Sequence, residues 1–327
     1  MSYVPTPFAT PIYPPSLYSA YREAPYISPS WYRFAPTAVG TLGLVPGSPE
    51  QSSDSLASLV EVISRASAWM DEYCFWKADG SFSASVTVES AWVLPKPTGQ
   101  LVLITNFKPI RTVIGVAVGC APSQLQTLDQ NCANDITTGE KTITLPGYWT
   151  GSPRPFFGGY PSTNGLVYCV YSYVAGWPHT TLAASVTAGA TSITVNPSTP
   201  GGSALYGAQA GTPLTIKDAA NAETVVLAST PTSLTLSLVN PVQYNHTIPA
   251  APSPDSIIVT ALPWGLEQAC VHITSVLLKT RGTRSTVLPQ IGGASMPNKQ
   301  ALARAGALAD FDVAMKLLHP FRVAYLH

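Results

Sequence analysis

The sequence predicts an α+β protein in which a small helical bundle is combined with many short strands. Apolar residues recur at helical spacing in three segments, near residues 54–76, 264–281 and 299–318. Residues 82–177 instead show short apolar runs separated by glycine and proline turns, which is typical of strands. Residues 179–255 carry a further series of short strands and indicate an inserted all-β module.

The composition restricts the class of function before any motif is considered. The chain has 327 residues, zero formal net charge and only 10% charged residues, against about 25% in a typical protein. Zero net charge gives no overall field that favours nucleic acid or an anionic membrane. We interpret the low charge as a surface largely covered by other subunits. A surface rich in Ser, Thr, Gly and Pro is the alternative.

The cysteines and the N-terminus point to a chain without disulfides, a secretion signal or a membrane span. The five cysteines are scattered and lack the CxxC spacing of a zinc site, so we expect small buried thiols in a reducing compartment. They are Cys74, Cys120, Cys132, Cys169 and Cys270. Met1–Thr10 has no basic segment followed by an apolar one, and no run of 18 apolar residues occurs.

Residues 1–52 are predicted to form an extended arm rich in proline and tyrosine. A residue before proline is held extended, so we expect no regular helix here. A disordered linker is usually poor in aromatic residues, whereas this segment is rich in them. We interpret it as an arm that lies on a neighbouring subunit, and an arm wrapped around its own domain is the alternative. The inter-subunit candidates are Tyr13, Tyr18, Tyr21, Tyr26 and Trp31.

The first helix is predicted from Ser53 or Asp54 to Trp76. Both starting residues are good N-caps, and Asp54 also suits the positive end of the helix dipole. On the polar face, Glu61 and Arg65 are spaced as a favourable pair. The apolar face is formed by Leu56, Leu59, Val60, Ile63, Ala66, Ser67, Met70, Tyr73 and Cys74.

Strands are predicted throughout residues 82–177. The segment 83–92 alternates, with Phe82, Ala84, Val86 and Val88 in phase. Further strands are expected at 101–104, 106–118, 142–145 and 166–174. The long Gly/Pro/aromatic loop at 146–165 is expected to contact a neighbouring subunit, and a sugar or base platform is the alternative. Its candidate residues are Trp149, Arg154, Phe156, Phe157 and Tyr160.

The chain is therefore divided into an arm at 1–52, a helical and β core of 53–178 plus 256–327, and the inserted β module at 179–255. The module is predicted to be a small sandwich or barrel, because its short strands follow one another about every ten residues. Ala188-Gly189-Ala190 is expected to form a hairpin turn between strands at 185–186 and 192–195.

No catalytic or metal-binding signature is present, so we expect neither an enzyme nor a cofactor site. The chain lacks GxSxG, GxGxxG, Walker A, HExxH and EF-hand patterns. Its five histidines are far apart, and His272 is expected to be satisfied structurally or exposed. Asp310 and Asp312 lie two apart on a helix and make a poor carboxylate pair.

Positive charge gathers in the C-terminal part of the chain. Residues 264–327 carry seven basic and three acidic side chains. Lys279, Arg281 and Arg284 cluster where the second helix ends. They either complement the helix dipole or form a basic lining that faces a phosphate backbone.

Several short motifs, in this order, resemble those of a known family. The first helix contains Ala66-Ser67 followed by Asp71-Glu72-Tyr73-Cys74, and the strands end in Tyr171-Ser172-Tyr173-Val174-Ala175-Gly176-Trp177-Pro178. Leu262-Pro263 leads a helix that closes on Leu277-Leu278-Lys279-Thr280-Arg281-Gly282, and the last helix ends in Leu317-Leu318-His319-Pro320-Phe321-Arg322. This order resembles the head-to-tail adaptor (connector) proteins of tailed double-stranded-DNA bacteriophages with siphovirus-type necks.

The resemblance covers residues 54–327 and implies a structural virion protein. Such proteins form a ring, usually of twelve copies, between the portal protein and a stopper or tail-completion protein. The implied place is the virion neck, after assembly in the host bacterial cytoplasm, with non-specific contact to genomic DNA in a channel. Lys279, Arg281 and Arg284 become channel candidates. The C-terminal segment is implied to dock on the portal, with Arg304, Lys316, Phe321, Arg322 and Tyr325 as candidates.

Two other interpretations stay open. The chain could be another neck or tail protein, such as a stopper or tail-completion protein. It could also be a carbohydrate- or cell-surface-binding β-module that uses Trp149, Phe156, Phe157 and Tyr160.

Overall fold

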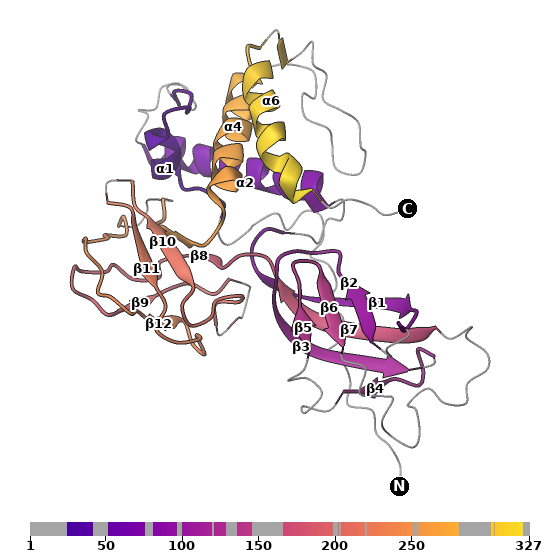
Figure 1. The fold of residues 1–327 in the computed structure, drawn as a ribbon. Coiled ribbons are helices and arrows are strands. Elements are labelled where there is room, and N and C mark those ends of the chain that lie inside the picture. Colours follow the sequence, from indigo (N-terminus) through magenta and orange to yellow (C-terminus); the bar gives the residue numbers. More distant parts are fainter. Residues whose placement is uncertain are drawn as a thin grey trace. The chain divides into compact units, whose positions relative to one another are not determined.

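The computed structural model describes residues 25–41, 52–75, 81–96, 100–119, 121–128, 136–145, 166–198, 202, 204–219, 221–250, 253, 255–280, 302–303 and 305–322. Within these residues the fold is α+β, as predicted, with a few helices and four antiparallel sheets (Figure 1). The chain forms two compact units. The helical unit comprises Met1–Ser81, Pro249–Ser256 and Pro263–His327, and the β unit comprises Phe82–Ile248 and Ile257–Leu262.

These units group the chain differently from the predicted domains. The strands of residues 82–177 fall in one unit with the β module, whereas the sequence suggested that they share a core with the helices. The sheet of the β module also includes residues 258–260, beyond the expected end at 255. The domain assignment itself stays a prediction.

The first long helix, α2 (Ser53–Phe75), lies within one residue of its predicted range. Its predicted apolar face is buried: Leu59, Ile63 and Met70 have no exposed surface. The cap differs from the prediction. Ser52 accepts a hydrogen bond from the Ser55 amide at 3.2 Å through its hydroxyl, so the N-cap lies one residue before Ser53.

The second long helix, α4 (Trp264–Thr280), is buried on nearly every side rather than on one face. Seven consecutive residues, from Cys270 to Val276, are buried, and seven residues make about two full turns. α4 packs against α2 and against α6 (Leu308–Leu318), which lies antiparallel beside it (Figure 1). The sequence predicted a single apolar stripe because it could not show that neighbours approach from several directions.

Two further expectations about helices are corrected. The helix predicted near 299–318 is interrupted: residues 302–303 are helical, residues 305–306 form a turn in which Gly306 adopts a left-handed φ of 64°, and α6 begins at Leu308. A short helix, α1 (Pro29–Phe34), occurs within the segment expected to lack helix. Proline is well suited to the first turn of a helix, and the Ser28 hydroxyl caps it by accepting from the Trp31 amide.

In the β unit, residues 82–177 form two stacked sheets. One has the order β1-β7-β3-β4, from β1 (Ser85–Val93), β7 (Val167–Ala175), β3 (Ile110–Gly119) and β4 (Gln126–Thr127). The other has the order β2-β6-β5, from β2 (Leu101–Ile104), β6 (Thr142–Leu145) and β5 (Thr137–Thr138). The Tyr171 hydroxyl donates to the Ile104 carbonyl at 3.0 Å and thereby links the two sheets.

The strand β1 turns two of its three valines outward. Phe82 and Ala84 are buried, but Val86 and Val88 are 45% and 63% exposed. Glu89 lies on the opposite, inward side, where it meets Tyr171 and Tyr173. Apolar alternation would by itself direct the valines to the core, so this strand is inverted relative to its pattern.

The β module, defined here as residues 179–248 and 257–262, is built on two small sheets. The larger has the order β11-β10-β13-β8, from β11 (Glu223–Val226), β10 (Pro213–Lys217), β13 (Ile258–Thr260) and β8 (His179–Thr181). The smaller pairs β9 (Ser192–Thr194) with β12 (Thr235–Ser237). Since β8 enters and β13 leaves as neighbouring strands, the module begins and ends at one place.

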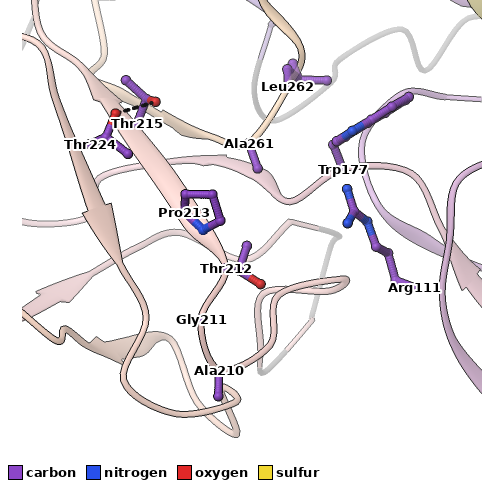
Figure 2. Close-up of a pocket in the computed structure, with 10 residues that line it drawn as sticks. All are labelled: Arg111, Trp177, Ala210, Gly211, Thr212, Pro213, Thr215, Thr224, Ala261 and Leu262. Carbon is purple, nitrogen blue, oxygen red and sulfur yellow. Dashed lines mark hydrogen bonds between the residues drawn. The ribbon is translucent and has the colours of Figure 1, made fainter.

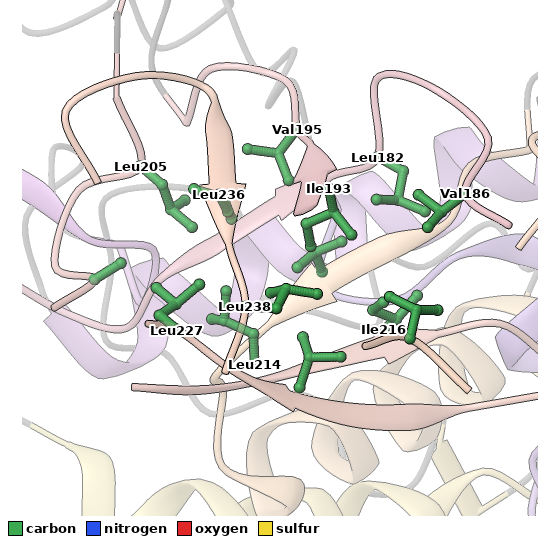
Figure 3. Packing of buried hydrophobic residues seen from close by; sticks show 14 of the residues in the cluster. Leu182, Val186, Ile193, Val195, Leu205, Leu214, Ile216, Leu227, Leu236 and Leu238 are labelled. Atoms are coloured by element: carbon green, nitrogen blue, oxygen red, sulfur yellow. The ribbon is translucent and has the colours of Figure 1, made fainter. Parts of the chain in front are cut away.

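Aliphatic side chains from these strands and from the segments that connect them form one core (Figure 3). Its labelled members are Leu182, Val186, Ile193, Val195, Leu205, Leu214, Ile216, Leu227, Leu236 and Leu238. The predicted turn at Gly189 exists, with a φ of 89°, but it does not close a hairpin. Val186 pairs with His246, and β9 pairs with β12, so each side of the turn joins a different partner.

Candidate functional site

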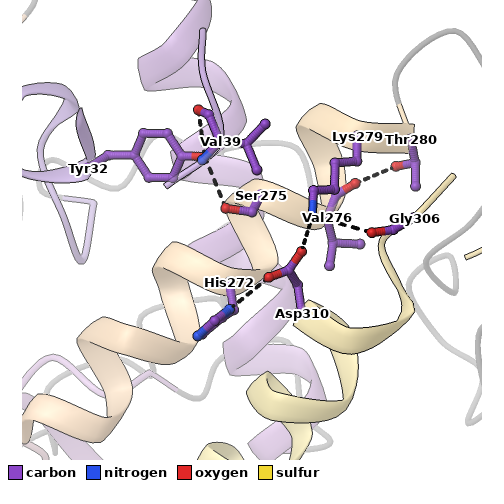
Figure 4. A network of polar contacts seen from close by, with 9 residues as sticks. All are labelled: Tyr32, Val39, His272, Ser275, Val276, Lys279, Thr280, Gly306 and Asp310. Carbon is purple, nitrogen blue, oxygen red and sulfur yellow. Dashed lines mark hydrogen bonds and ion pairs between the residues drawn. The ribbon is translucent and has the colours of Figure 1, made fainter. Parts of the chain in front are cut away.

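The polar network between α4 and α6 contains the first residue of the predicted basic cluster. Lys279 donates from Nζ to Asp310 Oδ2 at 2.5 Å and to the Gly306 carbonyl at 3.3 Å (Figure 4). The other Asp310 oxygen lies 3.1 Å from His272 Nδ1. On another side of α4, the Tyr32 hydroxyl lies 3.0 Å from the Ser275 hydroxyl. The network therefore joins α1, α4 and α6 through side chains that are mostly buried.

The contact with Asp310 makes Lys279 a weaker candidate for lining a DNA channel. Its side chain is 29% exposed and that of Asp310 is 16% exposed, so much of its charge is balanced within the chain. A phosphate would have to compete with a carboxylate that is already in contact. Arg281 and Arg284, the other two channel candidates, lie outside the described residues.

The described portal-docking candidates lie at the end of α6 and in the 3₁₀ turn η2 (His319–Phe321). Lys316 is exposed. The Arg322 guanidinium lies 5.0 Å from the centre of the Tyr73 ring, which itself stacks on Trp69 at 5.3 Å. Phe321 lies close to Gly265 at the start of α4. Arg304 and Tyr325 lie outside the described residues.

The described part of the N-terminal arm packs on its own helical unit. Tyr26 is 1% exposed, its hydroxyl donates to the Asp71 carboxylate, and its amide donates to the Ser67 hydroxyl at 3.2 Å. Trp31 lies in α1 and is half-buried. For residues 25–41 these contacts favour the alternative of an arm wrapped around its own domain. Tyr13, Tyr18 and Tyr21 lie outside the described residues.

The remaining candidates belong to the long aromatic loop at 146–165. Trp149, Arg154, Phe156, Phe157 and Tyr160 lie outside the described residues.

A pocket of about 610 Å³ lies within the β unit (Figure 2). Arg111 and Trp177 form one side, and residues 210–213 with Thr215 and Thr224 form the other. Arg111 donates from Nε to the Gly176 carbonyl at 2.9 Å, and burial lowers the pKa of its guanidinium. The lining offers one cation, three threonine hydroxyls, two of which lie 3.2 Å from each other, and an indole. Such a lining can hold a hydroxyl-bearing or anionic group, and it places no nucleophile beside a base.

The buried histidines of the described chain are hydrogen-bonded to neighbouring side chains. His179 Nδ1 lies 3.0 Å from the Thr260 hydroxyl. His246 lies between two carboxylates, with Nδ1 3.1 Å from Asp218 and Nε2 2.8 Å from Glu223. Among the described residues no group of His, Cys, Asp and Glu is arranged to hold a metal ion. No helix in that part of the chain is long and apolar enough to cross a membrane.

Sequence reasoning missed two clusters that organise the β unit. The first joins Glu89 to Tyr171 and Tyr173, and the second joins His246 to Asp218 and Glu223. Glu89 and His246 each lie more than 20 residues from their partners, and the pairing of β1 with β7 brings the first cluster together. The one available signal was that Glu89 is the only charged residue of a nine-residue strand.

Glu223→Gln is expected to weaken the acid dependence of the β module. Burial alone would raise the pKa of Glu223. The hydrogen bonds from the backbone amide of Gln243, from His246 and from the backbone amide of Tyr244 outweigh this effect, so the pKa of Glu223 is lowered. A lowered pKa contributes stability that is present above the unfolded value, about 4.3, and is lost as the pH falls through the folded value. Urea unfolding at pH 7 and at pH 3 to 4 measures the difference.

The matched control for this experiment is Glu140→Gln. Glu140 is 70% exposed and pairs with Lys108 at 3.4 Å, so its removal should change stability little at either pH. At pH 7, Glu223→Gln should cost roughly 1–3 kcal/mol, because it removes the charge that faces His246. An unchanged acid dependence in Glu223→Gln would contradict the assignment.

Comparisons of the chain with protein-family models, with curated proteins and with solved structures found no match.

Proposed function

We propose that this chain is a structural virion protein of a tailed bacteriophage, which forms an oligomeric ring between the portal and the tail. The observation that carries the proposal is the order of the elements. A long helix is followed by strands that end at Gly176-Trp177-Pro178, then by the β module, and then by two helices that end at Pro320-Phe321-Arg322. This is the order in which the motifs of the head-to-tail adaptors occur. In this proposal α2, α4 and α6 form the helical bundle of the adaptor.

The backbone just after β7 also fits the motif Tyr171–Pro178, which is one of those that carry the resemblance. Gly176 has a φ of 102°, and a Cβ there would lie 2.8 Å from the Phe82 carbonyl oxygen. Only glycine fits without a shift of the backbone, so this position turns the chain from β7 into the β module. Gly176 of the motif thus lies at the point where the β module is inserted.

The proposed role needs no catalytic group. The ring provides a conduit for genomic DNA, one surface for the portal and another for a stopper or tail-completion protein. Weak local positive charge suits a channel through which DNA slides. The balanced charge of Lys279 is compatible with that requirement.

A deletion of residues 323–327 tests the docking role. It starts after Arg322 and therefore keeps the contacts of Phe321 and Arg322 with the helical unit. We expect a folded protein with unchanged circular dichroism, while filled heads accumulate without tails in a phage that carries the deletion. Normal yields of tailed, infectious particles would exclude docking by this segment.

Imaging of the purified chain and of labelled virions tests the location. We expect ring-shaped particles in negative stain and label at the virion neck. Label at the tail tip would instead favour the alternative neck or tail roles.

The pocket beside Arg111 and Trp177 is the observation that favours a second candidate, a carbohydrate-binding β-module. Binding of the wild-type chain to a glycan array, lost in Trp177→Ala, would support this candidate. Its absence together with rings would leave the structural role.

A further inference from the structure

On one face of the sheet, the strand β1 presents apolar side chains to solvent. The outer face is defined here by the residues of β1 and β7 that point away from the β2-β6-β5 sheet: Val86, Val88, Ser90, Trp92, Tyr168, Val170 and Ser172. Val174, which pairs with Val86, is buried and lies at the limit of this face. Val88 is 63% exposed and Trp92 is 46% exposed. Leu94, which directly follows β1, is 64% exposed. Scattered apolar residues are ordinary on a surface, but a contiguous patch marks an interaction site.

The outer face carries no charged side chain. The only charge of β1, Glu89, is on the inner face and is hydrogen-bonded to Tyr171 and Tyr173. An open antiparallel sheet normally presents polar residues to water, whereas β1 presents valine and tryptophan side chains. A face without charge offers nothing to a phosphate backbone or to an acidic peptide. Its partner must therefore be apolar.

The edge of the same sheet is also open. Within the described residues β1 pairs with β7 on one side and with no strand on the other. Its nine residues contain neither proline nor lysine, the residues with which proteins usually protect an edge strand. An open edge presents unpaired amide and carbonyl groups, which another strand can complete.

We propose that the outer face and the free edge of β1 are the contact surface for a second copy of this chain. The inference rests on the proposed ring and names the surface through which its subunits meet. A closed ring uses two different surfaces of each subunit. The sheet supplies two different edges, β1 on one side and the two exposed residues of β4 on the other. Because only 10% of the residues of this chain are charged, a second copy can supply the apolar surface that this face requires.

The test compares two exposed valines of the full-length chain. Val88→Lys places a charge on the outer face, and Val239→Lys places the same charge in the β module, where the valine is 57% exposed. Sedimentation velocity over a concentration series measures self-association. We expect roughly tenfold to hundredfold weaker association for Val88→Lys and wild-type association for Val239→Lys. Circular dichroism and thermal unfolding check that both variants remain folded.

The outcomes separate this inference from the proposed function. If the wild type associates and Val88→Lys associates equally well, the surface is assigned wrongly while the ring can stand. If Val88→Lys is defective but the wild type forms only dimers, the surface stands and the ring fails. A wild type that is monomeric at all concentrations overturns the inference. If Val88→Lys then also has a lowered Tm, another part of the same chain covers the outer face.

Discussion

Glu89→Ala is expected to destabilise the β unit by about 2–4 kcal/mol, because its carboxylate completes three hydrogen bonds. The Glu89 carboxylate accepts from the Tyr173 hydroxyl at 2.6 Å, from the Tyr171 hydroxyl at 3.2 Å and from the backbone amide of Asn106 at 3.1 Å. Tyr171 keeps a second acceptor, the Ile104 carbonyl. The Tyr173 hydroxyl is left without its acceptor in a side chain that has no exposed surface.

Differential scanning calorimetry measures this loss. A cost of this size should lower the Tm of the β unit by roughly 5–15 °C. Glu61→Ala is the matched control, because Glu61 is 53% exposed and pairs with Arg65 on the surface of α2, where the pair is worth at most about 0.5 kcal/mol. Equal Tm values for the two variants would show that Glu89 is not needed to satisfy the tyrosines.

The cluster of Glu89, Tyr171 and Tyr173 is also expected to make the stability of the β unit depend on pH in the alkaline range. Burial first, and the neighbouring Glu89 charge second, raise the pKa values of Tyr171 and Tyr173. A raised pKa contributes stability that is complete below the unfolded value, about 10, and is lost as the pH rises toward the folded value. The β unit should therefore lose stability above pH 10. In Glu89→Ala this dependence should be shallower, since both the charge and the hydrogen bond of Glu89 help to raise these pKa values.

The elements of the fold could be predicted because their signals are local. The spacing of Leu59, Ile63 and Met70 is enough to define the buried face of α2. Turns at Gly189 and Gly306 follow from the freedom of glycine to adopt positive φ, although only the first was expected. Local rules also misled: the proline-rich arm was expected to exclude helix, yet proline begins α1.

What the sequence could not show is which side of an element meets a partner. β1 alternates well enough to be recognised as a strand, but whether its valines or Glu89 face inward depends on Tyr171 and Tyr173, some 80 residues away. α4 looks amphipathic in isolation and is buried by three neighbouring helices together. The basic cluster could be read from composition, whereas the contact of Lys279 with Asp310 depends on a turn at Gly306.

Lys279→Glu is expected to destabilise the helical unit by roughly 2–4 kcal/mol, because it removes a partly buried partner of Asp310 and puts a like charge in its place. Lys316→Glu is the matched control: it makes the same charge change at an exposed position of α6, and we expect a change within about 0.5 kcal/mol. Thermal unfolding of both variants measures the difference.

The charge swap Lys279→Glu with Asp310→Lys separates a role in the fold from a role toward DNA. Restored stability in the double variant identifies a pair whose partners depend on each other, as a double-mutant cycle requires. His272, which lies 3.1 Å from Asp310, would then face a cation, so restoration should be incomplete. If Lys279→Glu instead leaves the Tm unchanged and impairs DNA retention in virions, Lys279 serves the channel. The folding role predicted here leaves Arg281 and Arg284 to carry any contact with DNA, and reversal of their charges tests that contact without disturbing the α4–α6 pair.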